Sequence, residues 1–164
     1  TGLNYNPVLT FSGASTKELQ GVGNFSFSGN NTMIAVARNA STVFSAVFAS
    51  NNSYGSGSNE GPSLATAISS GFKGYALDNN GNVFAETPQY TSPAVVTGQY
   101  TDAHTGRTYL NGVQYSGNLT SASDIVSNAT NFEIGGRTMG GGTYNTRIFT
   151  GNIAEVIYYN RGIS

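Results

Sequence analysis

The apolar residues of this chain recur at alternate positions within short segments, and clusters of Gly, Asn, Ser and Pro separate these segments. Residues 32–38 (TMIAVAR), 42–49 (TVFSAVFA) and 94–100 (AVVTGQY) show the pattern most clearly. A period of two places successive side chains on opposite faces of a β-sheet. Only residues 15–21 and 121–128 are compatible with helix, and only as single turns. The pattern therefore predicts an all-β protein.

Two segments have the turn chemistry of β-hairpins. Asn111-Gly112 joins two short strands, and both residues tolerate the positive φ that a two-residue hairpin turn requires. The stretch DNNG at residues 78–81 joins another pair of strands in the same way. Residues 50–61 (SNNSYGSGSNEG), by contrast, are expected to form a long loop. Roughly a dozen short strands with frequent turns predict a sandwich of two sheets.

The closing stretch of the chain, residues 132–164, has the most informative pattern. It predicts a short strand, a glycine-rich loop, a second strand from about residue 146, and a final apolar strand over residues 153–159. The final strand has apolar side chains on both expected faces: Ile153, Ile157 and Tyr159 on one, and Ala154, Val156 and Tyr158 on the other. A strand that is apolar on both faces belongs in the interior of a packed sheet.

Three parts of the sequence resemble one family. They are NYNPVLTFSG at residues 4–13, VVTGQYTD followed by TYLNGV within residues 95–113, and IGGR followed by FTGNIAEVIYYNRGIS at the end. This combination resembles the laminin-G-like, concanavalin A-like jelly-roll domains of bacterial surface proteins. The resemblance implies a two-sheet antiparallel jelly-roll sandwich, with residues 1–164 forming one such domain.

The composition limits the function classes. Charged residues make up 9% of the chain, with 7 Lys and Arg against 8 Asp and Glu, so no strong field attracts nucleic acid or an anionic lipid surface. The apolar runs are shorter than the ~20 residues of a membrane span. Cysteine is absent, which excludes disulfides and thiol chemistry. The chain begins at Thr1 without a methionine and shows no signal-like segment, so we expect a domain of a larger protein. Low charge with abundant Asn, Ser and Thr is common in bacterial surface proteins, so we expect that protein to be secreted or displayed on the cell surface.

The carboxylates argue against an enzyme. Glucanases with this kind of fold place two acids roughly two to four residues apart on one strand, so that their carboxyl groups lie about 5 Å apart at the sugar. Here the nearest candidates, Asp78 and Glu86, lie on either side of a hairpin turn. Glu155 is the one acid within a strongly apolar strand. We interpret it as a structural acid paired with Arg161 or Arg137 rather than a catalytic or metal-binding group.

Metal binding has weak support in the sequence. His104 is the only histidine, and without Cys or a second His it cannot complete a zinc site. Residues 78–82 (DNNGN) have the oxygen-rich composition of a calcium loop but lack the spaced acids of an EF-hand, so a hairpin turn is the simpler explanation. The laminin-G resemblance implies that one Ca²⁺ is compatible with this domain, although it assigns no ligands.

Carbohydrate binding requires aromatic rings that stack on sugars and polar groups that bind hydroxyls. Loop tyrosines beside such groups occur within residues 50–61, 87–93 and 137–147. The central glycines of the last loop allow close approach to a ligand, and two flanking arginines supply planar donors. The predicted ligand-binding residues are Tyr144, Arg147 and Arg137, with Tyr54, Asn59 and Tyr90 as further candidates. The alternative is that the tyrosines cover loops and that the arginines pair with Glu133 or Glu155.

These observations predict a non-catalytic binding module used in adhesion or carbohydrate recognition. Its partners would be a glycan or another cell-surface ligand and the neighbouring domains of its own chain, with no membrane insertion. A structural spacer or protein-binding domain without a sugar site is the first alternative, and a glycoside hydrolase is a less favoured one. An exposed aromatic ring beside convergent polar groups in one cleft would favour the lectin-like interpretation over the spacer.

Overall fold

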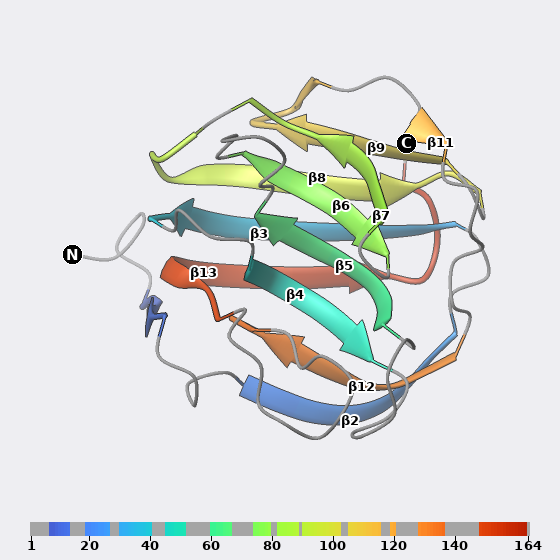
Figure 1. Ribbon diagram of the computed structural model, residues 1–164, viewed down its shortest axis with the longest axis horizontal. Coiled ribbons are helices and arrows are strands. Elements are labelled where there is room, and N and C mark those ends of the chain that lie inside the picture. The colour runs from blue at the N-terminus through green and yellow to red at the C-terminus, as the bar shows by residue number, and fades with distance from the viewer. Residues whose placement is uncertain are drawn as a thin grey trace.

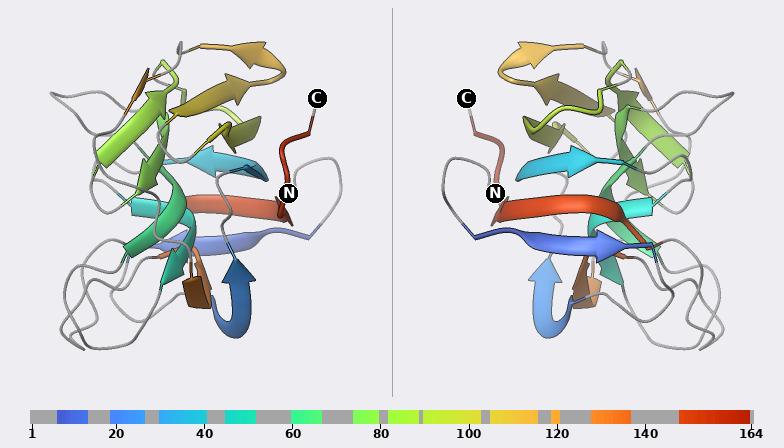
Figure 2. Two further views of the ribbon diagram at one scale, coloured as in Figure 1. Left: turned by 90° about the vertical axis from the view of Figure 1, so that its right-hand side faces the viewer. Right: turned by 90° about the vertical axis from the view of Figure 1, so that its left-hand side faces the viewer.

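The computed structural model describes residues 7–13, 19–26, 30–40, 45–51, 60–66, 74–79, 82–88, 90–102, 105–115, 119–120, 128–136 and 148–163. These residues form two antiparallel sheets and contain no helix (Figure 1). The side views of Figure 2 show the sheets as two layers that face each other. The predicted all-β sandwich is therefore confirmed.

Sheet A has seven strands, and sheet B has six. In spatial order sheet A consists of β1 (Leu9–Ser12), β13 (Thr150–Tyr159), β3 (Asn31–Asn39), β8 (Ala94–Tyr100), β9 (Thr105–Leu110) and β10 (Val113–Gln114), while β11 (Leu119–Thr120) also pairs with β9. Sheet B consists of β2 (Leu19–Ser26), β12 (Asn128–Ile134), β4 (Ser45–Asn51), β5 (Glu60–Thr66), β6 (Tyr75–Asn79) and β7 (Asn82–Glu86). The last strand thus lies inside sheet A, as its apolar pattern predicted.

Most predicted strands are present, and three local predictions are wrong. The two strands expected from about residue 146 and over residues 153–159 form one strand, β13 (Thr150–Tyr159). β3 and β8 form where they were expected, and Asn111 and Gly112 have φ values of 51° and 81° in the hairpin between β9 and β10. The sequence analysis missed β5, which begins inside the segment predicted as a loop. Residues 19–21, expected in a helical turn, pair with β12 instead.

The two faces of β13 also differ from the prediction. The pairing register of β13 with β3 shifts between Ile153 and Glu155, which marks a β-bulge. An extra residue reverses the alternation of the side chains that follow it. As a result Ile153 is buried in the core together with the inward-facing Val156 and Tyr158, whereas Ile157 is half-buried on the opposite, outward face.

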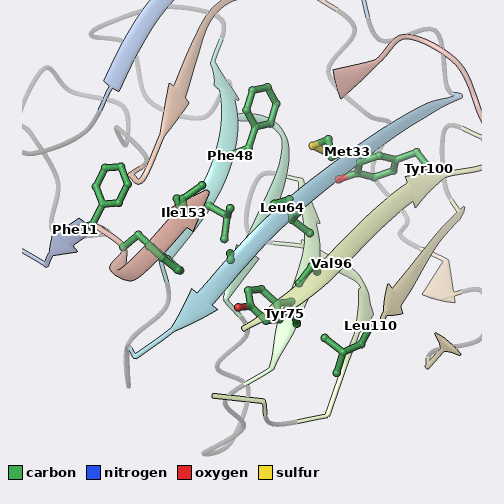
Figure 3. Packing of buried hydrophobic residues seen from close by; sticks show 14 residues of the cluster. Phe11, Met33, Phe48, Leu64, Tyr75, Val96, Tyr100, Leu110 and Ile153 are labelled. Atoms are coloured by element: carbon green, nitrogen blue, oxygen red, sulfur yellow. The ribbon is translucent and has the colours of Figure 1, made fainter. Parts of the chain in front are cut away.

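The hydrophobic core lies between the two sheets (Figure 3). Phe48 of β4 stacks on Phe132 and on Tyr158, with ring centroids 6.3 Å and 6.0 Å apart, and so links β12 of its own sheet to β13 of the other. Burial raises the pKa of the Tyr158 hydroxyl to about 12, and burial raises the pKa of Tyr75 as well. Within the described residues no helix is long and apolar enough to span a membrane.

Candidate functional site

A groove lies on the outward face of sheet A, where β8 and β9 run side by side. Alternation along β8 turns Ala94, Val96 and Tyr100 into the core, and these three residues are buried. Thr97 and Gln99 therefore face outward, and each is half-buried. Their partners across the ladder are Tyr109 for Thr97 and Arg107 for Gln99. Four side chains thus form a floor with an aromatic ring, an amide, a guanidinium and a hydroxyl.

Two segments form the walls of this groove. The hairpin turn between β9 and β10 contributes Gly112, and the segment after β13 contributes Gly162 and Ile163. The cavity has a volume of about 510 Å³, within the ~300–1,000 Å³ typical of small-molecule sites. Its complete lining is Thr32, Thr97, Gln99, Thr101, Arg107, Tyr109, Gly112, Gly162 and Ile163.

The chemistry of the lining suits a polyhydroxylated ligand. Threonine hydroxyls and the Gln99 amide can both donate and accept hydrogen bonds, which matches sugar hydroxyls that do the same. The Arg107 guanidinium provides several donors in one plane and can bind paired hydroxyls or a carboxylate. Tyr109 offers a ring with a polar end. The groove therefore places a half-buried aromatic ring beside convergent polar groups.

Of the six predicted ligand-binding residues, only Tyr90 falls within the described part of the chain. Its ring is half-buried and packs against the core cluster, and its hydroxyl accepts a hydrogen bond from Asn111 Nδ2 at 3.4 Å. Tyr90 thus supports the β9–β10 turn and does not line the groove. Tyr54, Asn59, Arg137, Tyr144 and Arg147 lie outside the described residues, and their role stays a prediction.

The two glutamates whose side chains are described lie on different sheets. Glu133 is fully buried on β12, and Glu155 is exposed at the bulge of β13. They cannot act together on one substrate, because one belongs to sheet B and the other to the outward face of sheet A. The bulge turns Glu155 outward, and its pairing with Arg161 or Arg137 stays a prediction.

The metal predictions fall mostly outside the described residues. His104 and residues 80–81 of the predicted calcium loop are among these, while Asp78 and Asn82 belong to the paired strands β6 and β7. Among the described residues, no three His, Cys, Asp or Glu side chains are placed to hold a metal ion. The suggestion of calcium therefore stays a prediction.

Solved structures share this arrangement of strands. A native heptameric SAP-like pentraxin from Limulus polyphemus has a TM-score of 0.67 and 12% identity, covering 100% of this chain and 80% of the pentraxin chain. The CBM40 of a Ruminococcus gnavus IT-sialidase has a TM-score of 0.60 and 17% identity, covering 96% of this chain and 94% of its own. The fold is a concanavalin A-like jelly roll.

A third neighbour is a sialidase. The Trypanosoma rangeli sialidase has a TM-score of 0.54 and 15% identity, and the match covers 82% of this chain but 21% of the sialidase. At the sequence level no family profile and no curated protein matches the chain. These likenesses show the fold, and the identity of a ligand has to be argued from the groove.

The sequence analysis did not select the residues of the groove. It searched for binding groups in long loops, whereas Gln99, Arg107 and Tyr109 lie within regular strands. A usable signal was present, since the outward positions of β8 and β9 are polar apart from Val95. The contribution of Gly162 and Ile163 could not be read from the pattern, because it depends on where the chain turns after β13.

Proposed function

We propose that this chain is a non-catalytic, lectin-like carbohydrate-binding module, and that the groove on the outward face of sheet A binds a sugar. The observation that carries the proposal is the position of Tyr109 beside Gln99, Arg107 and Thr97 in one cavity. An aromatic ring beside convergent hydrogen-bonding groups is the arrangement that a sugar with an apolar and a polar face requires.

Two of the structural neighbours support this ligand class. The Ruminococcus gnavus CBM40 has been solved bound to α2,3-sialyllactose, with a TM-score of 0.57, and bound to α2,6-sialyllactose, with a TM-score of 0.56. Arg107 makes a carboxylate-bearing sugar one natural candidate for the groove of this chain. Neutral sugars are the other, because the remaining lining groups are uncharged.

The wider setting of the module is a proposal that is supported by the sequence resemblance. We propose a laminin-G-like domain of a secreted or cell-surface bacterial protein, which serves in adhesion and operates beside other domains of its chain. Several weak sites in one chain or on one surface would add avidity to a shallow groove. Ca²⁺ binding by the loops remains part of the proposal. A glycan screen with and without Ca²⁺ tests whether sugar binding depends on this ion.

The groove assignment is tested by titrating α2,3-sialyllactose, α2,6-sialyllactose and lactose against the protein by calorimetry. Tyr109→Ala should weaken binding about tenfold or more, which corresponds to ~1.4 kcal/mol of contact energy. Arg107→Ala should weaken the sialylated sugars more than lactose if the guanidinium binds the carboxylate.

Two matched controls lie on the same face of the same sheet. Tyr159→Ala removes an exposed tyrosine of β13, and Arg38→Ala removes an exposed arginine of β3 whose Nε donates to Thr91 O at 3.4 Å. Neither residue lines the groove, so both variants should bind as the parent does. If all four variants bind the sugar with equal affinity, the sugar-binding site lies elsewhere on the protein. Absence of binding to any glycan would favour the spacer, and release of free sugar would indicate a hydrolase.

A further inference from the structure

The segment that follows β13 crosses the outward face of sheet A. We call residues 160–163 the C-terminal strap. Thr32 Oγ1 donates a hydrogen bond to Arg161 O at 3.1 Å and accepts one from the Ile163 N–H at 3.3 Å. Gln99 Nε2 donates to Ile163 O at 2.9 Å. In the right-hand part of the left view in Figure 2 the chain rises from the end of β13 along this side of the sandwich, opposite sheet B.

The hydrogen bonds of the strap come from side chains. A chain that crosses strands cannot join the backbone ladder of the sheet, so its own amide groups need other partners. Thr32 of β3 and Gln99 of β8 are direct neighbours in register and supply these partners together. The strap in turn covers Thr32, which has 0% exposure although it faces outward.

The strap also shapes the groove. Gly162 and Ile163 form one of its walls, and a Cβ atom at Gly162 would lie 3.3 Å from Gln99 Nε2, so the backbone rests closely on that amide. Gln99 has two amide hydrogens and a carbonyl oxygen. After it donates to Ile163 O it retains a donor and an acceptor that can face a ligand.

We propose that the C-terminal strap is the specificity-determining wall of the groove and that Thr32 is the positioning residue that holds it in place. This inference rests on the proposed sugar-binding function. Thr32 borders the groove but has 0% exposed surface beneath the strap, so a bound sugar touches Ile163 and Gln99 rather than the Thr32 hydroxyl. Sugar affinity therefore depends on a hydroxyl that the sugar does not contact. By reciprocity, a sugar that binds against the docked strap also stabilises its docking.

Thr32→Val tests the proposal, because it removes both hydrogen bonds of the hydroxyl while a branched side chain of similar shape remains. Two quantities are measured: the exchange rate of the Ile163 amide by NMR, and the dissociation constant for the sialyllactose or lactose that the parent protein binds. We expect the Ile163 amide to exchange at least about tenfold faster, and the sugar to bind about tenfold more weakly.

Thr10→Val is the matched control. Thr10 lies on β1 of the same sheet, and its Oγ1 accepts a hydrogen bond from Asn152 Nδ2 at 3.0 Å, but it is not part of the groove. This variant should leave Ile163 exchange and sugar affinity unchanged. Gly162→Val gives a second route if Thr32→Val does not fold. The added side chain at this exposed position would contact the Gln99 amide and should weaken the hydrogen bonds that hold the strap, without changing the hydrophobic core.

The outcomes separate this inference from the proposed function. Fast Ile163 exchange with undiminished sugar affinity in Thr32→Val would overturn the strap as a wall, while the sugar site itself would stand. Weaker binding with unchanged Ile163 exchange would show that Thr32 acts by another route, which also overturns the inference. A parent protein that binds no sugar, although its Ile163 amide is protected, would refute the proposed function and with it the role of the strap in specificity.

Discussion

On sheet B three neighbouring outward positions, Ala49, Ser63 and Glu133, have at most 1% of their surface exposed. They lie side by side in register across β5, β4 and β12, and Phe132 and Ile134 on either side of Glu133 pack against the core. On sheet A, by contrast, the outward side chains of the groove floor are all partly exposed.

This contrast shows that polar residues on a strand do not by themselves indicate a binding surface. Ser63 and Glu133 are polar but buried, so they serve the fold through interactions inside the protein. Gln99 and Tyr109 are polar and accessible, so a ligand can reach them. The following predictions test the distinction between buried and accessible positions, beginning with the largest expected effect.

The first prediction concerns the two isoleucines on either side of the bulge in β13. Ile153→Ala removes a buried core side chain and should lower the free energy of unfolding by ~2–5 kcal/mol. Ile157→Ala acts on the half-buried outward face and should cost less than about 1.5 kcal/mol. Chemical denaturation of both variants measures the difference. If the two losses are equal, the bulge does not separate the faces as described.

The second prediction compares one glutamate on each outward face. Glu133→Ala should lower the free energy of unfolding by about 1–3 kcal/mol, because it removes a fully buried side chain together with its interactions inside the protein. Glu155→Ala should change it by less than about 0.5 kcal/mol, since Glu155 is exposed. The same urea titration measures both variants. A large loss of unfolding free energy in Glu155→Ala would contradict the conclusion that the outward face of sheet A is accessible to solvent.

The third and smallest effect is a dependence on alkaline pH. The pKa of Tyr158 is raised from 10.0 to about 12 in the folded protein by burial. Between these values the unfolded chain has released the proton and the folded chain retains it, so the free energy of unfolding falls as the pH rises through this window. Tyr158→Phe should reduce that fall. A pH dependence identical to that of the parent would show that Tyr158 is not protected on the inward face.

The sequence predicted best where the determining interactions are local. Asn111-Gly112 specifies its hairpin through backbone conformation alone, and β8 follows from simple alternation. β5 was missed because Gly61 and Pro62 resemble a turn, yet the strand forms between β4 and β6. The bulge in β13 was missed for a related reason, since apolar residues on both faces hide a change of alternation.

The candidate site was less predictable than the fold. Its floor combines β8 and β9, which a hairpin argument could have brought together, but its wall comes from residues 162–163. Their position depends on Thr32, which lies more than a hundred residues earlier in the chain. The local pattern of apolar and polar residues cannot reveal a contact between segments so far apart in the chain. Tyrosines in glycine- and serine-rich loops, by contrast, are easy to recognise in the sequence, and the prediction therefore favoured them.

The place of β13 between β1 and β3 also affects how the chain folds during synthesis. Of the described strands of sheet A, β13 is the last one to be synthesised, so the sheet cannot close before β13 has been made. The many long-range pairings of the sheet imply slow folding. We expect nascent chains stalled before residue 150 to remain sensitive to protease, and chains that extend beyond β13 and leave the exit tunnel to become resistant. Protection of the stalled chains would show that β1 and β3 can associate without their shared neighbour.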